Sequence, residues 1–415
     1  MATPFAPPRS YDQTALATGA SANGSRIFTA TYLDTEDRRL SRAGISLRRR
    51  MENGKSVWEL DVGQATREAD GGPGGPPTEI LRLLAAPLLG RELVEIARTR
   101  TRSEGDDVET ALLDGQRVVS LVADWRPKLP KPKKQKKVHT GAPALDRLCT
   151  YLKEQVDEIA LHDPGARLGE SPEHVHQLRV ATRRARSALR TARPLLDKAW
   201  VDGLRAELKW LGGELAPARD LDVLIDGLGK DAKKLGKPGS AIIRQLEGDR
   251  RRAQTRLVKA LDSPRYLSVL EELERGANAP RVRRVDKSLK KLARRDFRRL
   301  RRSVRALKKK PSDEALHEVR KRGKRARYAA ELAGGKRARR FAEAARSFQD
   351  VVGHHQDAVV AEERLTAFVP KAKSSDAVFA AGRLLERQHT RRRKARKSLP
   401  KAWKKLDRQG RKLWA

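Results

Sequence analysis

The sequence predicts a mainly α protein in which two similar helical bundles, related by a pseudo-twofold axis, follow a small β-rich α+β domain. Three observations support this fold class. The hydrophobic period changes from two residues to 3.6 residues across a basic, proline-rich segment. A motif in the helical part occurs twice. Proline and glycine separate most of the long Ala/Leu/Arg/Lys/Glu segments, as expected for successive helices.

The residues before the basic segment alternate between apolar and polar side chains, which favours β-strands. One Pro/Gly-rich stretch, Asp70–Pro77, is expected to be a loop. The segment from Pro77 to Leu89 resembles a short helix. We expect a domain over residues 1–126 and an extended linker over 127–137, PKLPKPKKQKK. The expected strands are 28–33, 45–49, 56–62 and 117–122.

The remaining residues, 138–415, are expected to form one helical domain with two repeats at about 138–278 and 279–415. Its apolar residues recur with the helical period. The expected helices are 144–161, 172–195, 201–215, 218–234, 240–260, 264–275, 285–310, 313–332, 336–352, 357–368, 376–398 and 401–412. The expected breaks are at Pro164, Pro238, Pro264, Pro311, Gly334-Gly335, Pro370 and Pro400.

The charge is concentrated in the helical part. The chain carries 92 Lys and Arg against 53 Asp and Glu, a net charge of +39. Residues 1–137 hold only +5 of this excess, so residues 138–415 hold +34. Such an excess repels itself and attracts polyanions. The candidate ligands are DNA, RNA, an anionic lipid surface or a phosphate polymer, and the alternative interpretation is a solvated basic surface without a ligand.

The internal repeat follows the pattern H-x-ϕ-R-x-x-x-[R/K]-R-A-R. It begins at His176 in the first repeat and at His317 in the second. An acidic residue follows after a similar interval, Asp220 in the first repeat and Asp357 in the second. A duplicated unit often forms its site where the two halves meet.

On a helix, the basic residues of each motif lie on one face, beside an apolar face that packs into a core. Neighbours in such a stripe are about 5–6 Å apart and repel one another until an anion neutralises them. Arginine supplies bidentate contacts to phosphate. The first stripe consists of His176, Arg179, Arg183, Arg186 and Arg190, and the second of His317, Arg320, Lys324 and Arg327.

The remaining acidic and histidine residues are expected to support the basic stripes rather than to act in catalysis. Asp220, Asp222 and Asp357 are expected to hold Arg and Lys side chains in position by ion pairs. The two motif histidines have either a structural or a ligand-binding role, and the His354-His355 pair, found in one repeat only, is interpreted as incidental. No metal-ligand spacing, Gly-rich phosphate loop or nucleophile–base constellation is present, so we expect no metal, no cofactor and no catalytic residue.

With these motifs, residues 138–415 resemble the CHAD family, the histidine α-helical domain. The resemblance implies two four-helix bundles around a basic pore or cleft that binds inorganic polyphosphate. Carried over by position, the polyphosphate-binding residues are His176, Arg179, Arg183, Arg184, Arg186, Arg190, Lys209, His317, Arg320, Lys321, Lys324, Arg325, Arg327 and Arg346. The second repeat departs from the first where Gln356-Asp357 replaces Arg219-Asp220, so this end of the site is expected to be asymmetric.

The N-terminal part resembles a truncated CYTH domain, the triphosphate-tunnel fold. The similarity rests on Tyr32–Thr35, Ala43–Arg50 and Val57–Leu60, and it implies that Arg48 and Arg50 point into the tunnel. The family's opening Glu-x-Glu-x-Lys strand is absent, and its later Glu-rich strands are also missing. We therefore expect a degenerate domain without metal-dependent triphosphatase activity.

Composition excludes several protein classes. No stretch approaches the ~18 apolar residues of a membrane span. The single cysteine, Cys149, excludes an internal disulfide framework and a cysteine-based zinc site. The first residues show no signal peptide, so a cytoplasmic location is expected, with association with polyphosphate granules inherited from the resemblance.

The leading hypothesis is a non-enzymatic polyphosphate-binding protein of unknown oligomeric state, without membrane partners. The alternative is a general polyanion-binding or nucleic-acid-binding protein, supported by the basic run His389–Lys397. Against this alternative, aromatic residues are only 4% of the chain, so there are few stacking platforms for single strands. A CYTH-type triphosphatase is the third hypothesis.

Overall fold

The computed structural model describes residues 25–63, 65–72, 74–104, 107–113, 116–120, 138–283, 287–372 and 374–414. These residues fall into two compact units. The first contains the described residues before 137 together with 156–178 and 261–271, and the second contains the rest. The predicted linker, 127–137, lies outside the described residues, so the domain boundary placed there stays a prediction.

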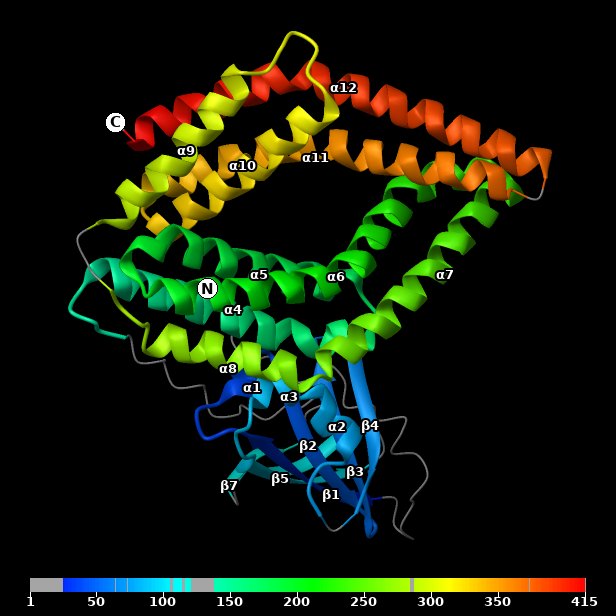
Figure 1. Cartoon of the computed structure of the whole chain (residues 1–415). Coiled ribbons are helices and arrows are strands. Elements are labelled where there is room, and N and C mark those ends of the chain that lie inside the picture. The colour runs from blue at the N-terminus through cyan, green and yellow to red at the C-terminus, as the bar shows by residue number, and fades with distance from the viewer. Residues whose placement is uncertain are drawn as a thin grey trace. The chain divides into compact units, whose positions relative to one another are not determined.

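The first unit contains a seven-stranded antiparallel sheet with the strand order β4-β3-β2-β1-β5-β6-β7 (Figure 1). Its strands are β1 (Ser25–Asp34), β2 (Ile45–Glu52), β3 (Lys55–Val62), β4 (Ala65–Gly71), β5 (Val94–Glu104), β6 (Asp107–Leu113) and β7 (Gln116–Ser120). Three short helices accompany it: α1 (Arg39–Arg42), α2 (Thr78–Leu83) and α3 (Ala85–Leu88). The register pairs Tyr32 with Arg48 and Arg48 with Glu59 across the three strands β1, β2 and β3.

The sequence patterns located four strands of this sheet and missed three. β4, β5 and β6 were not predicted, because β4 and most of β5 carry few apolar residues and the apolar residues of β6 do not alternate regularly with polar ones. The predicted helix 77–89 is two short helices separated at Leu84. In these elements, pairing with neighbouring strands decides the structure, and the local pattern does not reveal it.

The core of the first unit lies between the sheet and the short helices. Trp58 and Leu60 of β3 pack there with Ile80 and Leu84. Leu161, from the long helix α4, is packed against the same cluster. On the opposite face of the sheet, the carboxylate of Glu59 binds the guanidinium groups of Arg48 and Arg50.

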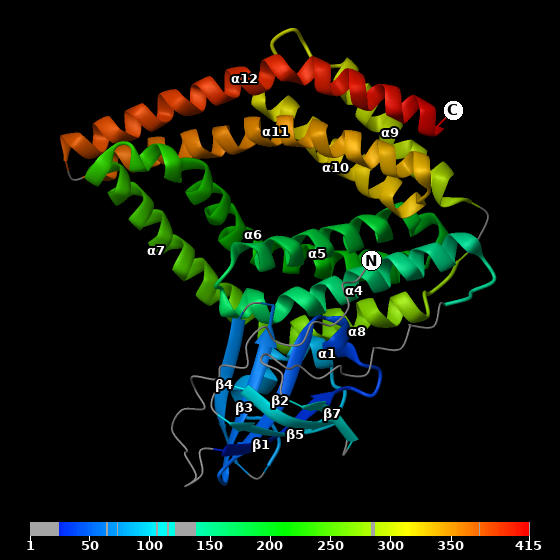
Figure 2. The ribbon, with the colours of Figure 1, turned by 180° about the vertical axis from the view of Figure 1, so that it is seen from behind.

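The helices confirm the predicted fold class. The first repeat contains α4 (Pro143–Leu168), α5 (Pro172–Ala192), α6 (Lys198–Lys233), α7 (Gly236–Leu261) and α8 (Pro264–Asn278), with the 3-10 turn η2 (Arg193–Leu195). The second contains α9 (Leu289–Arg305), α10 (Asp313–Ala333), α11 (Lys336–Phe368) and α12 (Ser375–Trp414), with η3 (Val369–Lys371). In both views α11 and α12 run side by side (Figures 1 and 2).

Several predicted breaks are not breaks. The helices expected at 201–215 and 218–234 form one helix, α6, that continues through Pro217. The same holds for α12, which continues through Pro400, and for α4, which contains Pro164. The segments 336–352 and 357–368 are likewise one helix, α11. An internal proline removes one helical hydrogen bond, and packing along the rest of a long helix offsets this loss.

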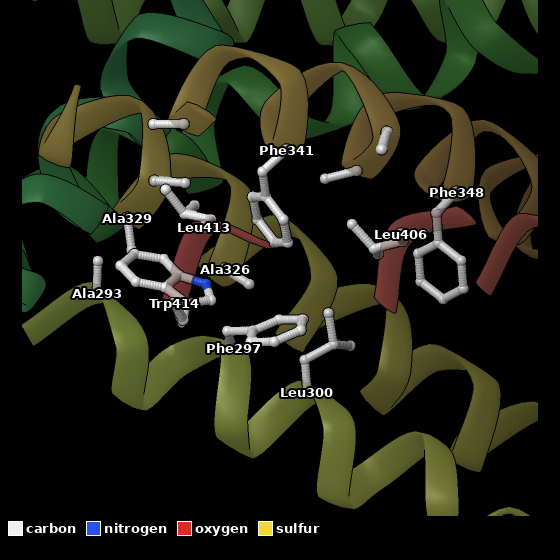
Figure 3. Packing of buried hydrophobic residues seen from close by; sticks show 14 of the residues in the cluster. Ala293, Phe297, Leu300, Ala326, Ala329, Phe341, Phe348, Leu406, Leu413 and Trp414 are labelled. Carbon is white, nitrogen blue, oxygen red and sulfur yellow. The ribbon is translucent and has the colours of Figure 1, made fainter. Parts of the chain in front are cut away.

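The core of the second repeat is an aromatic cluster joined by all four of its helices (Figure 3). Phe297 of α9 and Phe341 of α11 meet edge to face, with 5.4 Å between ring centroids. Trp414, near the end of α12, lies 6.5 Å from Phe341. Ala326 and Ala329 of α10 let these rings approach closely. The apolar face of α10 is therefore fixed, and its basic face is directed away from this core.

Candidate polyanion-binding site

The two motifs lie on α5 and α10, in corresponding positions of the two repeats. Ser312 caps the start of α10, where its hydroxyl accepts a hydrogen bond from the amide of Ala315. Leu316 and Val319 are buried, which leaves the basic side chains on another face of the helix. In the first motif, Arg179 and the residues after it belong to the same compact unit as α10, whereas His176 belongs to the first unit.

Each repeat contains an arginine–aspartate pair at the same place in its motif. Arg179 Nη1 lies 2.8 Å from Asp220 Oδ1, and Arg320 Nη2 lies 3.6 Å from Asp357 Oδ1. These pairs join α5 to α6 and α10 to α11. His317 Nδ1 lies 2.9 Å from the side-chain oxygen of Gln356, the residue before Asp357. Each of the two aspartates therefore contacts an arginine of its own repeat, and the supporting role expected of them stays a prediction.

The arginines of these two pairs belong to a group of cations from both motif helices, which we call the central basic cluster. It consists of Arg179, Arg183, Arg320, Lys324 and Arg327. Burial lowers the pKa of Lys324 to about 6, and Arg320, Arg183 and Arg179 lower it further. Burial also lowers the pKa of Arg183, which faces Arg179, Arg320 and Arg327. The carboxylates nearby therefore do not balance the positive charge of the cluster.

A carboxylate outside the repeated motif holds the motif helices together. Glu331, at the end of α10, accepts from Arg184 Nε of α5 at 3.2 Å and lies 3.5 Å from Arg327 Nε. Tyr151 of α4 donates its hydroxyl to the same carboxylate at 3.3 Å. Arg184, predicted to bind polyphosphate, is thus engaged in an ion pair between α5 and α10.

Two other predicted site residues make contacts of a different kind. The Arg190 guanidinium binds both oxygens of Asp296 on α9, at 3.1 and 2.9 Å, and Asp296 is buried. Asp222 pairs with Arg250 of α7 at 3.1 Å rather than with a motif arginine. Asp222 thus holds an arginine of α7, and its expected role beside the basic stripe stays a prediction.

The remaining predicted residues are exposed. Lys321 forms an ion pair with Glu318, one turn earlier on α10. Arg186 faces Arg205 and Arg325, and burial followed by these two cations lowers the pKa of Arg186. Lys209 and Arg346 lie exposed on α6 and α11, and no contact with the central basic cluster is found for either within the described residues.

Both motif helices fall within the span of one known protein family. Residues 150–366, more than half of the chain, match the CHAD domain family.

The chain belongs to the CHAD family.

Relatives of this CHAD protein support the assignment. Two proteins of Mycobacterium tuberculosis, "Uncharacterized protein MT2285" (strain CDC 1551 / Oshkosh) and "Uncharacterized protein Rv2226" (strain ATCC 25618 / H37Rv), are 32% identical over 288 residues. The match covers 65% of this chain and 55% of theirs, so the chain spans about half the length of these relatives.

Two solved structures are similar to the CHAD protein. PptA from Streptomyces chartreusis is 26% identical, with a TM-score of 0.54, and the match covers 63% of this chain and 100% of PptA. The CHAD domain from the plant Ricinus communis is 26% identical, with a TM-score of 0.51, and the match covers 63% of this chain and 91% of that domain.

The basic run His389–Lys397 lies outside the residues that match the CHAD family and within α12. It is not a tail. Arg392 and Arg396 both bind Asp313 at 2.6 Å, and Arg391 binds Asp231 of α6 at 2.8 Å. These arginines connect α12 to α10 and α6, which the local sequence did not reveal.

Sequence reasoning missed Glu331, Asp296 and Tyr328 in this CHAD domain. Tyr328 is buried under Arg327, whose guanidinium carbon lies 4.8 Å from the ring centroid. Glu331 follows Arg327 by four residues, a spacing that favours an ion pair and was present in the sequence. Asp296 carries a weaker signal, since it is the one acidic residue in the arginine-rich α9.

The described helices contain no segment with the length and apolar character of a membrane span. Among the same residues, no group of three or more His, Cys, Asp and Glu side chains is placed to hold a metal ion.

Proposed function

We propose that this protein binds inorganic polyphosphate, without catalysis, through the central basic cluster and the exposed cations beside it. The observation that carries the proposal is the set of cations that α5 and α10 bring together, with a Lys324 pKa of about 6. Holding these charges together is unfavourable until an anion neutralises them. A linear chain of phosphates supplies one charge after another along such a surface, and arginines bind phosphate oxygens in pairs.

Membership of the CHAD family supports the same ligand, because the sequence resemblance to that family implies polyphosphate binding. Association with polyphosphate granules would follow from such binding. The whole set of binding residues, including His176, Lys209 and Arg346, remains part of this proposal.

For the N-terminal sheet we propose a degenerate CYTH-like domain without triphosphatase activity. Arg48 and Arg50 lie on one face of β2, and both bind the carboxylate of Glu59. A triphosphate would have to displace this carboxylate. Hydrolysis of tripolyphosphate measured with and without Mg²⁺ tests this proposal, and metal-dependent turnover would contradict it.

Competition tests the ligand class directly. Labelled long-chain polyphosphate is bound at ~0.15 M salt and challenged with excess duplex DNA, RNA and short phosphates at fixed salt, because affinities driven by charge depend steeply on ionic strength. We expect unlabelled polyphosphate to compete far better than nucleic acid. Equal competition by DNA or RNA would instead indicate a general polyanion-binding protein.

Replacing Arg179, Arg183 and Arg320 with Ala should weaken polyphosphate binding by about 1–3 kcal/mol for each charge-assisted hydrogen bond that the substitution removes. Titration by fluorescence anisotropy measures the change. The matched control replaces three exposed cations of α7, Arg244→Ala, Arg256→Ala and Lys259→Ala, which lowers the net charge equally. Equal losses of affinity in both triple variants would mean that only net charge matters.

A further inference from the structure

Helix α9 carries a second concentration of positive charge, outside the two repeated motifs. Its apolar face, which includes Ala293, Phe297 and Leu300, is buried in the core of the second repeat (Figure 3). Arg295, Arg299 and Arg302 follow one another at four- and three-residue intervals on another face and are exposed. No ion pair is found for these three arginines within the part of the chain that the structure describes.

Two cavities open along this face of α9. The first, of about 360 Å³, is lined by basic side chains from α5, the start of α6 and α9. The second, of about 530 Å³, lies between α9 and α10. Arg299 and Asp296 line both. The other cations include Arg190 and Arg295 in the first cavity, and Arg302, Arg322 and Arg325 in the second.

Charge within the cavities is unbalanced. Among the described residues that line either cavity, Asp296 is the one acidic residue, and Arg190 already binds both of its carboxylate oxygens. Among the cations that line the cavities, Arg193 binds Asp202, whereas Arg295, Arg299 and Arg302 have no ion pair among the described residues. An anion is the species that would complete this surface.

The α9 cavities adjoin the motif helices, because side chains of α5 and α10 line them. Arg325 of α10, which lines the second cavity, is close enough to Arg186 and Arg190 of α5 to lower the pKa of both. Arg190 itself lines the first cavity. The basic side chains of the α9 cavities thus adjoin Arg186 and Arg190 of the α5 stripe.

We propose that the two cavities along α9 are a second contact region for consecutive phosphates of the same polyphosphate chain. This inference rests on the proposed function. The α5 stripe from Arg179 to Arg190 is about 16 Å long, so a short phosphate chain is held by it alone. A longer chain continues onto α9, and its affinity gains from the added contacts.

The test compares two triple variants across inorganic polyphosphates of graded length, from tripolyphosphate to long chains, at fixed salt. One variant replaces Arg295, Arg299 and Arg302 with Ala. The control replaces Arg294, Arg298 and Arg305 with Ala, which are equally exposed on the same helix but line neither cavity. Alanine and arginine are both strong helix formers, so both variants should retain α9.

We expect the cavity variant to lose affinity increasingly with chain length, reaching about tenfold or more for long chains, while the control changes little. Parallel curves for the two variants at every length would overturn the inference. If wild-type protein binds no polyphosphate at any length, the proposed function itself fails, and that outcome is distinct.

A measurement on the wild-type protein does not depend on the folding of a variant. Long-chain polyphosphate should protect Arg295, Arg299 and Arg302 from an arginine-modifying dicarbonyl reagent, as read by peptide mass spectrometry. Arg294 and Arg298 should remain reactive under the same conditions. Protection of both faces of α9 to the same extent would contradict a specific contact region.

Discussion

Burial and neighbouring cations disfavour the charged, ammonium form of Lys324 when no ligand is bound. It is half-buried and faces Arg320, Arg183 and Arg179, and Asp357 offsets these cations only in part. Its pKa of about 6 means that most molecules carry a neutral amine there at pH 8. A bound phosphate chain favours the charged form and therefore raises this pKa.

Polyphosphate binding should consequently take up a proton at Lys324. Between pH 6 and the higher pKa of the bound state, affinity should increase as the pH falls, because less free energy is spent on protonating the amine. We expect roughly a tenfold gain for each pKa unit by which binding raises the Lys324 pKa. Titrations at fixed salt from pH 8.5 to pH 5.5 measure the slope.

Lys324→Arg is the matched control, because a guanidinium stays charged over this whole range. It should bind more tightly than wild type at pH 8 and show a flatter pH profile. The slope that remains in this variant belongs to other titrating groups. An unchanged slope would show that Lys324 does not take up the proton.

At the scale of elements, the carboxylate of Glu331 joins three helices. It contacts Arg184 of α5, Arg327 of α10 and Tyr151 of α4, and the side chain of Glu331 is only 16% exposed. Without it, two half-buried guanidinium groups would lie beside each other with no shared acceptor. Glu331 is therefore a carboxylate that the two motif helices share.

Glu331→Gln should reduce the free energy of unfolding by about 1–3 kcal/mol, since the amide keeps the shape but loses the charge. Urea denaturation followed by circular dichroism measures the change. Glu343→Gln on α11 is the control, because Glu343 is exposed and its side chain has no ion pair among the described contacts. Similar denaturation midpoints for the two variants would contradict a stabilising role for Glu331.

The sequence predicts elements well where one local pattern decides them. The helix period, the change of period after the linker and the internal repeat predicted a mainly α fold, and the CHAD match and the structure confirm it. The continuation of helices through the prolines at 164, 217 and 400 was harder to predict, because the packing that keeps α4, α6 and α12 continuous comes from residues far away in the chain. For the same reason, the partners of Arg184 and Arg190 were not predictable from their own helix.

At the scale of the whole molecule, a net charge of +39 works against the folded state. A ligand that binds only the folded protein and neutralises part of this charge should stabilise it. At a free ligand concentration one hundred times the Kd, linkage alone contributes about 2.7 kcal/mol.

Long-chain polyphosphate should therefore raise the Tm in differential scanning fluorimetry, and the increase should shrink as salt is added. The Tm of the variant without Arg179, Arg183 and Arg320 should increase less at the same polyphosphate concentration. An equal gain for this variant would indicate that the stabilisation arises from diffuse charge over the surface.

The repeated arginine–aspartate pairs, Arg179–Asp220 and Arg320–Asp357, place the same kind of ion pair in each of the two repeats. The two repeats therefore offer similar contacts to a bound chain in either of its two orientations. A nucleic-acid strand does have a direction, so one of its two orientations would always be mismatched there. A linear polyphosphate repeats a single unit and is the same when reversed. Both orientations of the chain therefore make the same contacts with the protein.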